Sequence, residues 1–181
     1  IVDGEAPDVP MEAAKIVSTL SQQALDIHIR LREVDRDLLV WQRGNDVARR
    51  LMTIPGIGPI GATALAASIT DPRQFRSGRQ FAAWLGLTPL QKSSGGKERL
   101  GRITKMGDKY LRKLLIVGMT SLVRRAKYNP GKIDSRLADL LARKPTRVAT
   151  VAMANKTARV VWAIMARGET YRAGHQPALA A

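Results

Sequence analysis

The chain has 181 residues, with 30 Lys and Arg against 15 Asp and Glu, and so carries a formal net charge of +15. Cysteine is absent and there are only two histidines, which excludes disulfides, thiolate zinc sites and cysteine nucleophiles and argues against a histidine metal cluster. The sequence contains no apolar run long enough to span a membrane, and its 45% hydrophobic fraction is sufficient for a folded core. We therefore expect a folded, cytoplasmic protein whose partner is a polyanion.

The first predicted elements are a flexible leader over residues 1–10 and a long helix over 11–45. Apolar residues recur from Ala13 to Trp41 at alternating spacings of four and three, which is the heptad pattern of a coiled coil. No glycine or proline interrupts residues 11–43. Such a stripe needs a partner, which is either the chain's own domain or a second copy in a homodimer, and the sequence leaves both open.

Residues 46–170 are predicted to form one helical domain, followed by a flexible tail over 171–181. Apolar spacing, together with breaks at proline and glycine, predicts six helices in this domain. They span about 46–52, 60–69, 78–85, 105–127, 133–142 and 145–167. No useful period-2 alternation occurs, and the stretch 90–101 is interpreted as a polar loop. The predicted fold class is therefore all-α.

The positive charge is concentrated in one segment of this domain. Residues 92–147 hold 16 basic and 4 acidic side chains, a net of +12, whereas residues 1–45 hold 5 and 8, a net of −3. A concentrated excess of one sign favours a face that binds nucleic acid. The alternative is a solvated basic surface that has no ligand.

The run Ile54-Pro55-Gly56-Ile57-Gly58 lies between two predicted helices and resembles the turn of a helix-hairpin-helix. Glycine permits a tight turn with positive φ, so Gly56 and Gly58 would let backbone N–H groups approach a phosphate closely. The next helix adds free N–H donors and its dipole at the same point. An ordinary helix–helix turn is the alternative interpretation.

A second candidate site is the loop after residue 90 and the helix start that follows it. Lys and Arg side chains there would make charge-assisted contacts to phosphate. These candidate cations are Lys97, Arg99, Arg102, Lys105, Lys109 and Arg112. They flank Ser93 and Ser94, which are ordinary loop residues on chemistry alone.

Four motifs occur in a fixed order along the chain. They are Ile54-Pro55-Gly56-Ile57-Gly58, Phe81-Ala82-Ala83-Trp84-Leu85-Gly86-Leu87-Thr88-Pro89, Ser94-Gly95, and Lys105-x-Gly107-x-x-x-Leu111-Arg112. Together they resemble the C-terminal domain of the DEDD-type insertion-sequence transposases, the IS-one-ten group that also includes the Piv DNA invertases. The likeness covers about residues 51–125, with weaker similarity on either side.

The resemblance implies a recombinase built from two parts. In this family an N-terminal RuvC-like domain supplies four acidic residues that bind Mg²⁺, and a coiled coil assembles dimers. Some members use a bridge RNA to choose donor and target DNA. The serine nucleophile of the family matches Ser94 best, with Ser93 as the alternative.

This sequence lacks the βαβ pattern and the carboxylate quartet of a RuvC-like domain. We therefore expect it to be a C-terminal part of a longer protein, to hold no metal itself and to be inactive alone. The expected partners are DNA, a bridge RNA if this member uses one, and a second copy of the chain. The alternative function is a non-enzymatic helix-hairpin-helix module, in which Ser94 only shapes the loop.

Overall fold

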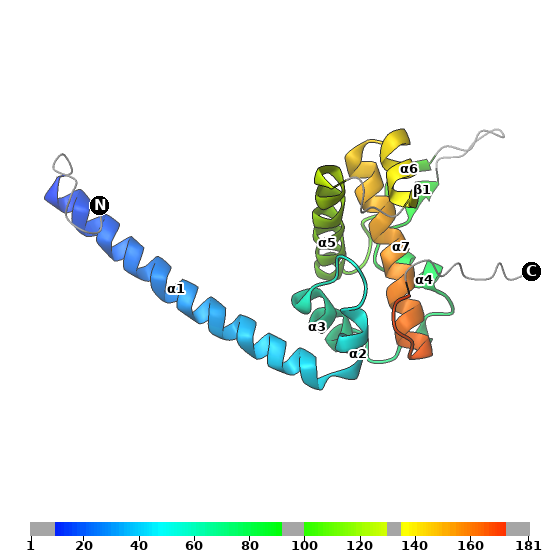
Figure 1. Ribbon diagram of the computed structural model, residues 1–181, viewed down its shortest axis with the longest axis horizontal. Helices are drawn as coiled ribbons and strands as arrows, with labels where there is room; N and C mark the ends of the chain where they lie inside the picture. Colours follow the sequence, from blue (N-terminus) through cyan, green and yellow to red (C-terminus); the bar gives the residue numbers. More distant parts are fainter. Residues whose placement is uncertain (1–9, 92–99, 130–134, 173–181) are drawn as a thin grey trace, which may run out of the picture. The chain divides into compact units, whose positions relative to one another are not determined.

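A computed structural model describes residues 10–91, 100–129 and 135–172. The chain divides into two compact units, Ile1–Trp41 and Gln42–Ala181. Figure 1 shows the elements in chain order, coloured from blue to red. They are α1 (Met11–Gly44), α2 (Asp46–Leu51), α3 (Pro59–Ser68), the 3₁₀ turn η1 (Pro72–Gln74), α4 (Gly78–Trp84), β1 (Pro89–Gln91), β2 (Leu100–Ile103), α5 (Lys109–Tyr128), α6 (Ser135–Arg143) and α7 (Thr146–Arg167).

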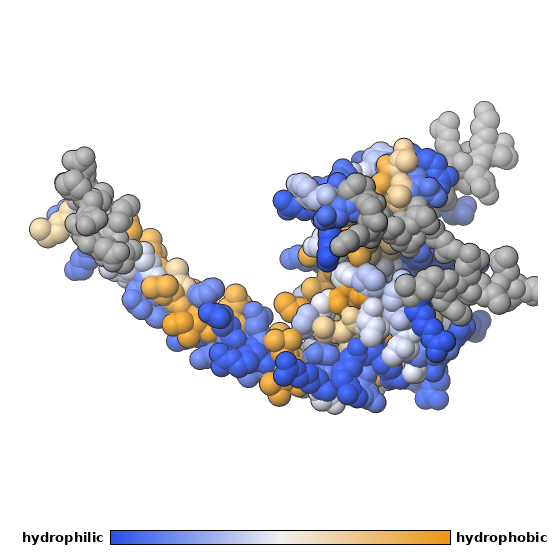
Figure 2. Space-filling view, viewed as in Figure 1, coloured by the Kyte–Doolittle hydropathy of each residue, from blue (hydrophilic) through white to orange (hydrophobic). Residues whose placement is uncertain are grey.

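The first unit consists of the greater part of the single long helix α1, as the uninterrupted sequence predicts. Its apolar stripe stays on the surface of that helix. Ile27, for example, is 66% exposed, and Leu31 and Val34 are both more than half exposed. Figure 2 shows hydrophobic residues interspersed with hydrophilic ones along this helix.

Helices of the second unit begin and end at residues whose chemistry suits those positions. The Asn45 side chain accepts a hydrogen bond from the N–H of Ala48 and so caps α2. Ser77 caps α4 and Asp108 caps α5 in the same way. At the other end, α7 stops at Gly168, which adopts the left-handed conformation common after a helix.

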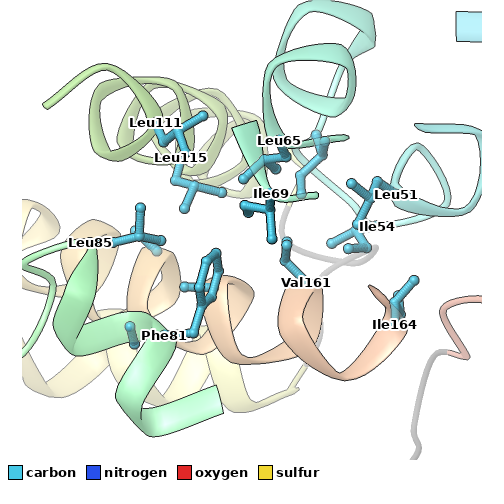
Figure 3. Packing of buried hydrophobic residues seen from close by; sticks show 14 of the residues in the cluster. Leu51, Ile54, Leu65, Ile69, Phe81, Leu85, Leu111, Leu115, Val161 and Ile164 are labelled. Atoms are coloured by element: carbon cyan, nitrogen blue, oxygen red, sulfur yellow. The ribbon is translucent and has the colours of Figure 1, made fainter. Parts of the chain in front are cut away.

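The core of the second unit forms around α7, which packs against α2, α4, α5 and α6. Figure 3 shows the centre of this core, where Phe81 of α4 and Val161 of α7 meet side chains from α3 and α5. The labelled members are Leu51, Ile54, Leu65, Ile69, Phe81, Leu85, Leu111, Leu115, Val161 and Ile164. A smaller cluster, built on Val123, Ala126 and Leu137, joins the end of α5 to α6.

The predicted all-α class is confirmed, with two local differences. Among the described residues there is one two-stranded antiparallel sheet, in which Pro89 pairs with Ile103 and Gln91 with Leu100, where the sequence predicted loop. Helix α5 begins at Lys109 rather than at 105, because Gly107 takes a positive φ of 88° and Asp108 caps the helix. No described helix is long and apolar enough to cross a membrane.

Candidate nucleic-acid interface

The turn between α2 and α3, residues 52–58, is anchored by its apolar side chains. Ile54 and Ile57 are buried in the core, and the N–H of Ile57 donates to the carbonyl of Ile54 at 3.1 Å. Between them Gly56 takes a φ of 85°, a conformation that favours glycine. The sequence predicted the need for glycine here, and the apolar anchors fix where the turn lies.

The α2–α3 turn rests directly on the backbone of α5. A Cβ atom added to Gly118 would lie 1.9 Å from the carbonyl oxygen of Gly56. One added to Gly56 would lie 2.3 Å from the Cε of Met119. Two glycines therefore permit a close approach of main chains, and they hold the turn against the side of α5. The role of Gly118 could not be predicted from the sequence, because a glycine within a helix carries no local sign of such a contact.

The N-terminus of α3 opens at this turn without a capping side chain. Gly58 has an extended backbone there and Pro59 occupies the first helical position. The N–H groups of Ile60 and Gly61 make no hydrogen bond to other described residues. Unpaired N–H groups at a helix start carry partial positive charge and suit an anion.

A shallow groove of about 220 Å³ runs between the α2–α3 turn and α5. Glycine, proline and aliphatic residues form its entire lining. They are Gly56, Ile57, Gly58, Pro59, Ile60, Gly61, Leu114, Leu115, Val117 and Gly118. The groove therefore places the open end of α3 beside an apolar strip of α5.

A row of cations follows the exposed side of α5. Lys109, Lys113, Arg124 and Lys127 are spaced at intervals that return to one helix face, and all four are exposed. Neither of the two ion pairs found in the described ranges involves them. This surface, called here the α5 cation row, extends over about 27 Å at 1.5 Å per residue. Only Lys109 was singled out from the sequence, although helical periodicity could have identified the others.

Arg112 plays a different part from the other predicted phosphate contacts. Its side chain is buried, with only 8% exposed. Its Nη1 donates to the carbonyl oxygens of Leu85 at 2.9 Å, Met106 at 3.3 Å and Asp108 at 3.4 Å. Arg112 thus clamps the end of α4 to the start of α5, and its guanidinium is committed to the interior of the domain.

Four predicted site residues, Ser93, Ser94, Lys97 and Arg99, lie outside the described residues. The strands on either side of them are described. The N–H of Thr104 donates to the carbonyl of Thr88 at 2.9 Å. Beyond the strand ends, the N–H of Lys105, one residue after Thr104, donates to the carbonyl of Gly86, two residues before Thr88, at 3.1 Å.

The residue that follows β2 after Thr104 has an unusual backbone. Lys105 is the one non-glycine residue with positive φ, 57°, in the described part of the chain, and its side chain is exposed. Arg102 on β2 is exposed as well. Both predicted cations are therefore accessible, and Lys105 directly precedes Met106, one of the residues whose carbonyl Arg112 contacts.

A second hollow, of about 300 Å³, is lined by Asp46, Arg49, Arg50 and Thr170. Arg49 donates a hydrogen bond to Asp46, and this bond, together with the positive charge, holds the pKa of the Asp46 carboxyl below its usual value. The charge of Arg49 is therefore already paired. No three histidine or acidic side chains come together as metal ligands within residues 10–91, 100–129 and 135–172.

Residues 48–133 match the model of a family described as "Transposase IS116/IS110/IS902 family". A "Probable family 20 transposase" from Pseudomonas aeruginosa is 44% identical over 173 residues, which are 94% of this chain and 50% of the relative. The helical domain belongs to the IS116/IS110/IS902 transposase family. The resemblance drawn from the four motifs is thereby confirmed.

Other relatives of this transposase domain are similar over almost the whole chain. A "Putative transposase y4pF/y4sB" from Sinorhizobium fredii is 42% identical over 167 residues, 92% of this chain and 43% of the relative. A "Transposase for insertion sequence element IS1111A" from Coxiella burnetii is 36% identical over 174 residues, 96% of this chain and 48% of the relative. The chain thus spans about half the length of these curated relatives.

Proposed function

We propose that this chain is the C-terminal, DNA-binding part of a transposase or site-specific recombinase of an insertion sequence. The observation that carries the proposal is the family match over residues 48–133. That range contains the α2–α3 turn, Ser93 and Ser94, and the whole of α5. Relatives named as transposases at 36–44% identity support the same role.

In this proposal the α2–α3 turn and the α5 cation row hold the sugar–phosphate backbone. The unpaired N–H groups of Ile60 and Gly61 would receive one phosphate, as in a helix-hairpin-helix. Exposed Lys109 and Lys113 would neutralise others, together with Arg102 on β2 and Lys105 just after it. Contacts of this kind position a duplex without reading its sequence.

The chemical step would belong to Ser94, with Ser93 as the alternative. The serine Oγ would attack a DNA phosphorus, and a P–Oγ bond would form as the bond from phosphorus to one deoxyribose oxygen breaks. The proton lost by the serine is balanced by the proton that the departing hydroxyl gains. The product would be a phosphoserine link, which the reverse attack by another DNA hydroxyl resolves during strand exchange.

The described residues do not fit a magnesium site, because no cluster of acidic or histidine ligands is present among them. The proposal therefore assigns Mg²⁺ to the RuvC-like domain that the family resemblance implies, and no residue of this chain is given a role in binding the metal.

The proposal also includes a homodimer formed through the apolar stripe of α1, whose Ile27 and Leu31 are exposed. A bridge RNA as guide completes the set of proposed partners.

The test places Ser94→Ala and, separately, Ser93→Ala in the longer protein that carries this domain. Each variant is incubated with insertion-sequence end DNA, and covalent protein–DNA adducts are separated on a denaturing gel. We expect the Ser94→Ala variant to lose the adduct and the recombinant product, while the Ser93→Ala variant keeps both. The reverse result would move the role to Ser93, and adducts in both variants would contradict a serine nucleophile.

A further inference from the structure

The groove beside the α2–α3 turn differs from the basic surface around it. All ten of its lining residues are glycine, proline or aliphatic, so no side chain in the lining can donate or accept a hydrogen bond. Ile60 on one wall is 47% exposed and Val117 on the other is 53% exposed. The apolar lining therefore reaches the protein surface, where a ligand can contact it.

The charges next to this groove indicate what kind of ligand it receives. Lys113 of the α5 cation row lies one turn before Val117 on the helix surface, on the side away from Gly118, and Arg124 follows two turns after Val117 on the same side. A ligand lying along α5 would therefore meet apolar atoms in the groove and positive charge beside it. A nucleic-acid strand has this division, because its sugars present carbon atoms and its phosphates carry the negative charge.

The two kinds of sugar differ in the atom that they would present to this lining. Ribose carries a 2′-hydroxyl that donates and accepts hydrogen bonds, whereas deoxyribose has only hydrogen at that carbon. A 2′-hydroxyl pressed against Ile60, Leu114 and Val117 would lose water and find no side-chain partner. The main-chain donors at the end of the groove, in Ile60 and Gly61, are those that the proposed function gives to a phosphate.

We propose that this groove seats the deoxyribose of a DNA strand and discriminates against ribose. The inference rests on the proposed function, because it takes nucleic-acid binding as given. It adds that the strand in this groove is DNA and not RNA. In a complex that contains both DNA and RNA, the DNA backbone occupies the α2–α3 turn. The groove is open on one side, so part of the hydroxyl's hydration survives. We expect DNA to bind about 3- to 30-fold more tightly than RNA.

The test measures binding of the 181-residue chain to three single strands of one sequence, all at the same salt concentration. One strand is DNA, one is RNA, and one is RNA with 2′-fluorine in place of every 2′-hydroxyl. The fluorinated strand keeps the sugar shape of RNA but cannot donate the hydrogen bond. We expect it to bind as DNA does, because the hydroxyl and not the sugar shape is rejected.

Two matched variants locate the preference. Val117→Thr keeps the shape of the side chain and adds a hydroxyl to the groove wall, so we expect it to improve RNA binding and reduce the DNA-to-RNA ratio at least two-fold. Val148→Thr makes the same change at a residue of α7 that is 51% exposed and does not line the groove, and should leave the ratio unchanged. Both positions are exposed enough that neither variant should fail to fold.

The outcomes separate this inference from the proposed function. Failure of all three strands and of duplex DNA to bind the same chain would overturn the proposed function itself, whereas binding of the duplex alone would overturn the placing of a single sugar row in this groove. Equal binding of DNA and RNA, or fluorinated RNA that binds as weakly as RNA, would overturn the discrimination by the hydroxyl. A DNA preference that Val117→Thr leaves intact would overturn its assignment to this groove.

Discussion

Gly118→Ala should destabilise the domain, although alanine is normally the better residue inside a helix. The added Cβ would lie 1.9 Å from the carbonyl oxygen of Gly56, whereas ordinary contact begins at 3.4 Å, so the two main chains must separate by the difference, about 1.5 Å. Overpacking of a core costs about 1–3 kcal/mol, and main-chain atoms cannot rotate away, which favours the upper end. Alanine returns about 1 kcal/mol of helix propensity. The net expectation is a loss of about 2 kcal/mol in the free energy of unfolding.

The measurement is thermal and urea unfolding of the 181-residue chain, followed by circular dichroism at 222 nm. A loss of about 2 kcal/mol corresponds to a decrease in Tm of about 6 °C. The matched control is Gly61→Ala in α3, where an added Cβ meets only the Cγ2 of Ile57 at 3.6 Å, an ordinary contact. That variant should be unchanged or up to about 1 kcal/mol more stable. If Gly118→Ala were as stable as Gly61→Ala, the close approach of the turn to α5 would be refuted.

Three further predictions follow from the site. Arg112→Lys cannot reproduce the contacts of the buried guanidinium to three carbonyls and should lower the free energy of unfolding by about 2 kcal/mol in urea titrations; an unchanged midpoint would contradict the clamp. Lys109→Ala and Lys113→Ala together should reduce the slope of log affinity for duplex DNA against log salt by up to about 1.8, and an unaltered slope would remove them from the interface. Ile27→Asp with Leu31→Asp should convert a dimer to a monomer in sedimentation, whereas an unchanged mass would exclude this stripe as the dimer contact.

The helices could be predicted from sequence because the residues near each helix end determine where it begins and ends. Asn45, Ser77 and Asp108 begin helices as capping residues, and apolar spacing supplies the rest. Strands β1 and β2 could not be predicted, because segments of three and four residues are too short for alternation to show. Their pairing depends on two segments that are brought together where the end of α4 meets the residues just before α5, through the close approach of Gly107 to the carbonyl of Trp84 and the hydrogen bond from Arg112 to the carbonyl of Leu85.

The candidate site was less accessible to sequence reasoning than the fold. Gly56 could be predicted because it belongs to a turn motif. Its contact Gly118 could not, because the two residues are far apart in sequence and Gly118 has the sequence context of an ordinary helical glycine. Arg112 was grouped with phosphate-binding cations because its neighbours in sequence are basic. Its burial depends on the carbonyl of Leu85, 27 residues earlier, and only the tertiary packing reveals it.

The clamp made by Arg112 has a consequence for how this family can diversify. All three of its acceptors are main-chain carbonyls, so a substitution at Leu85, Met106 or Asp108 does not by itself remove an acceptor. Asn155 of α7 secures the same region through another main-chain acceptor, the carbonyl of Leu87 at 3.0 Å. Both anchors lie outside the segment between β1 and β2. We therefore expect substitutions in that segment that keep Ser94 to leave both anchors of the scaffold in place.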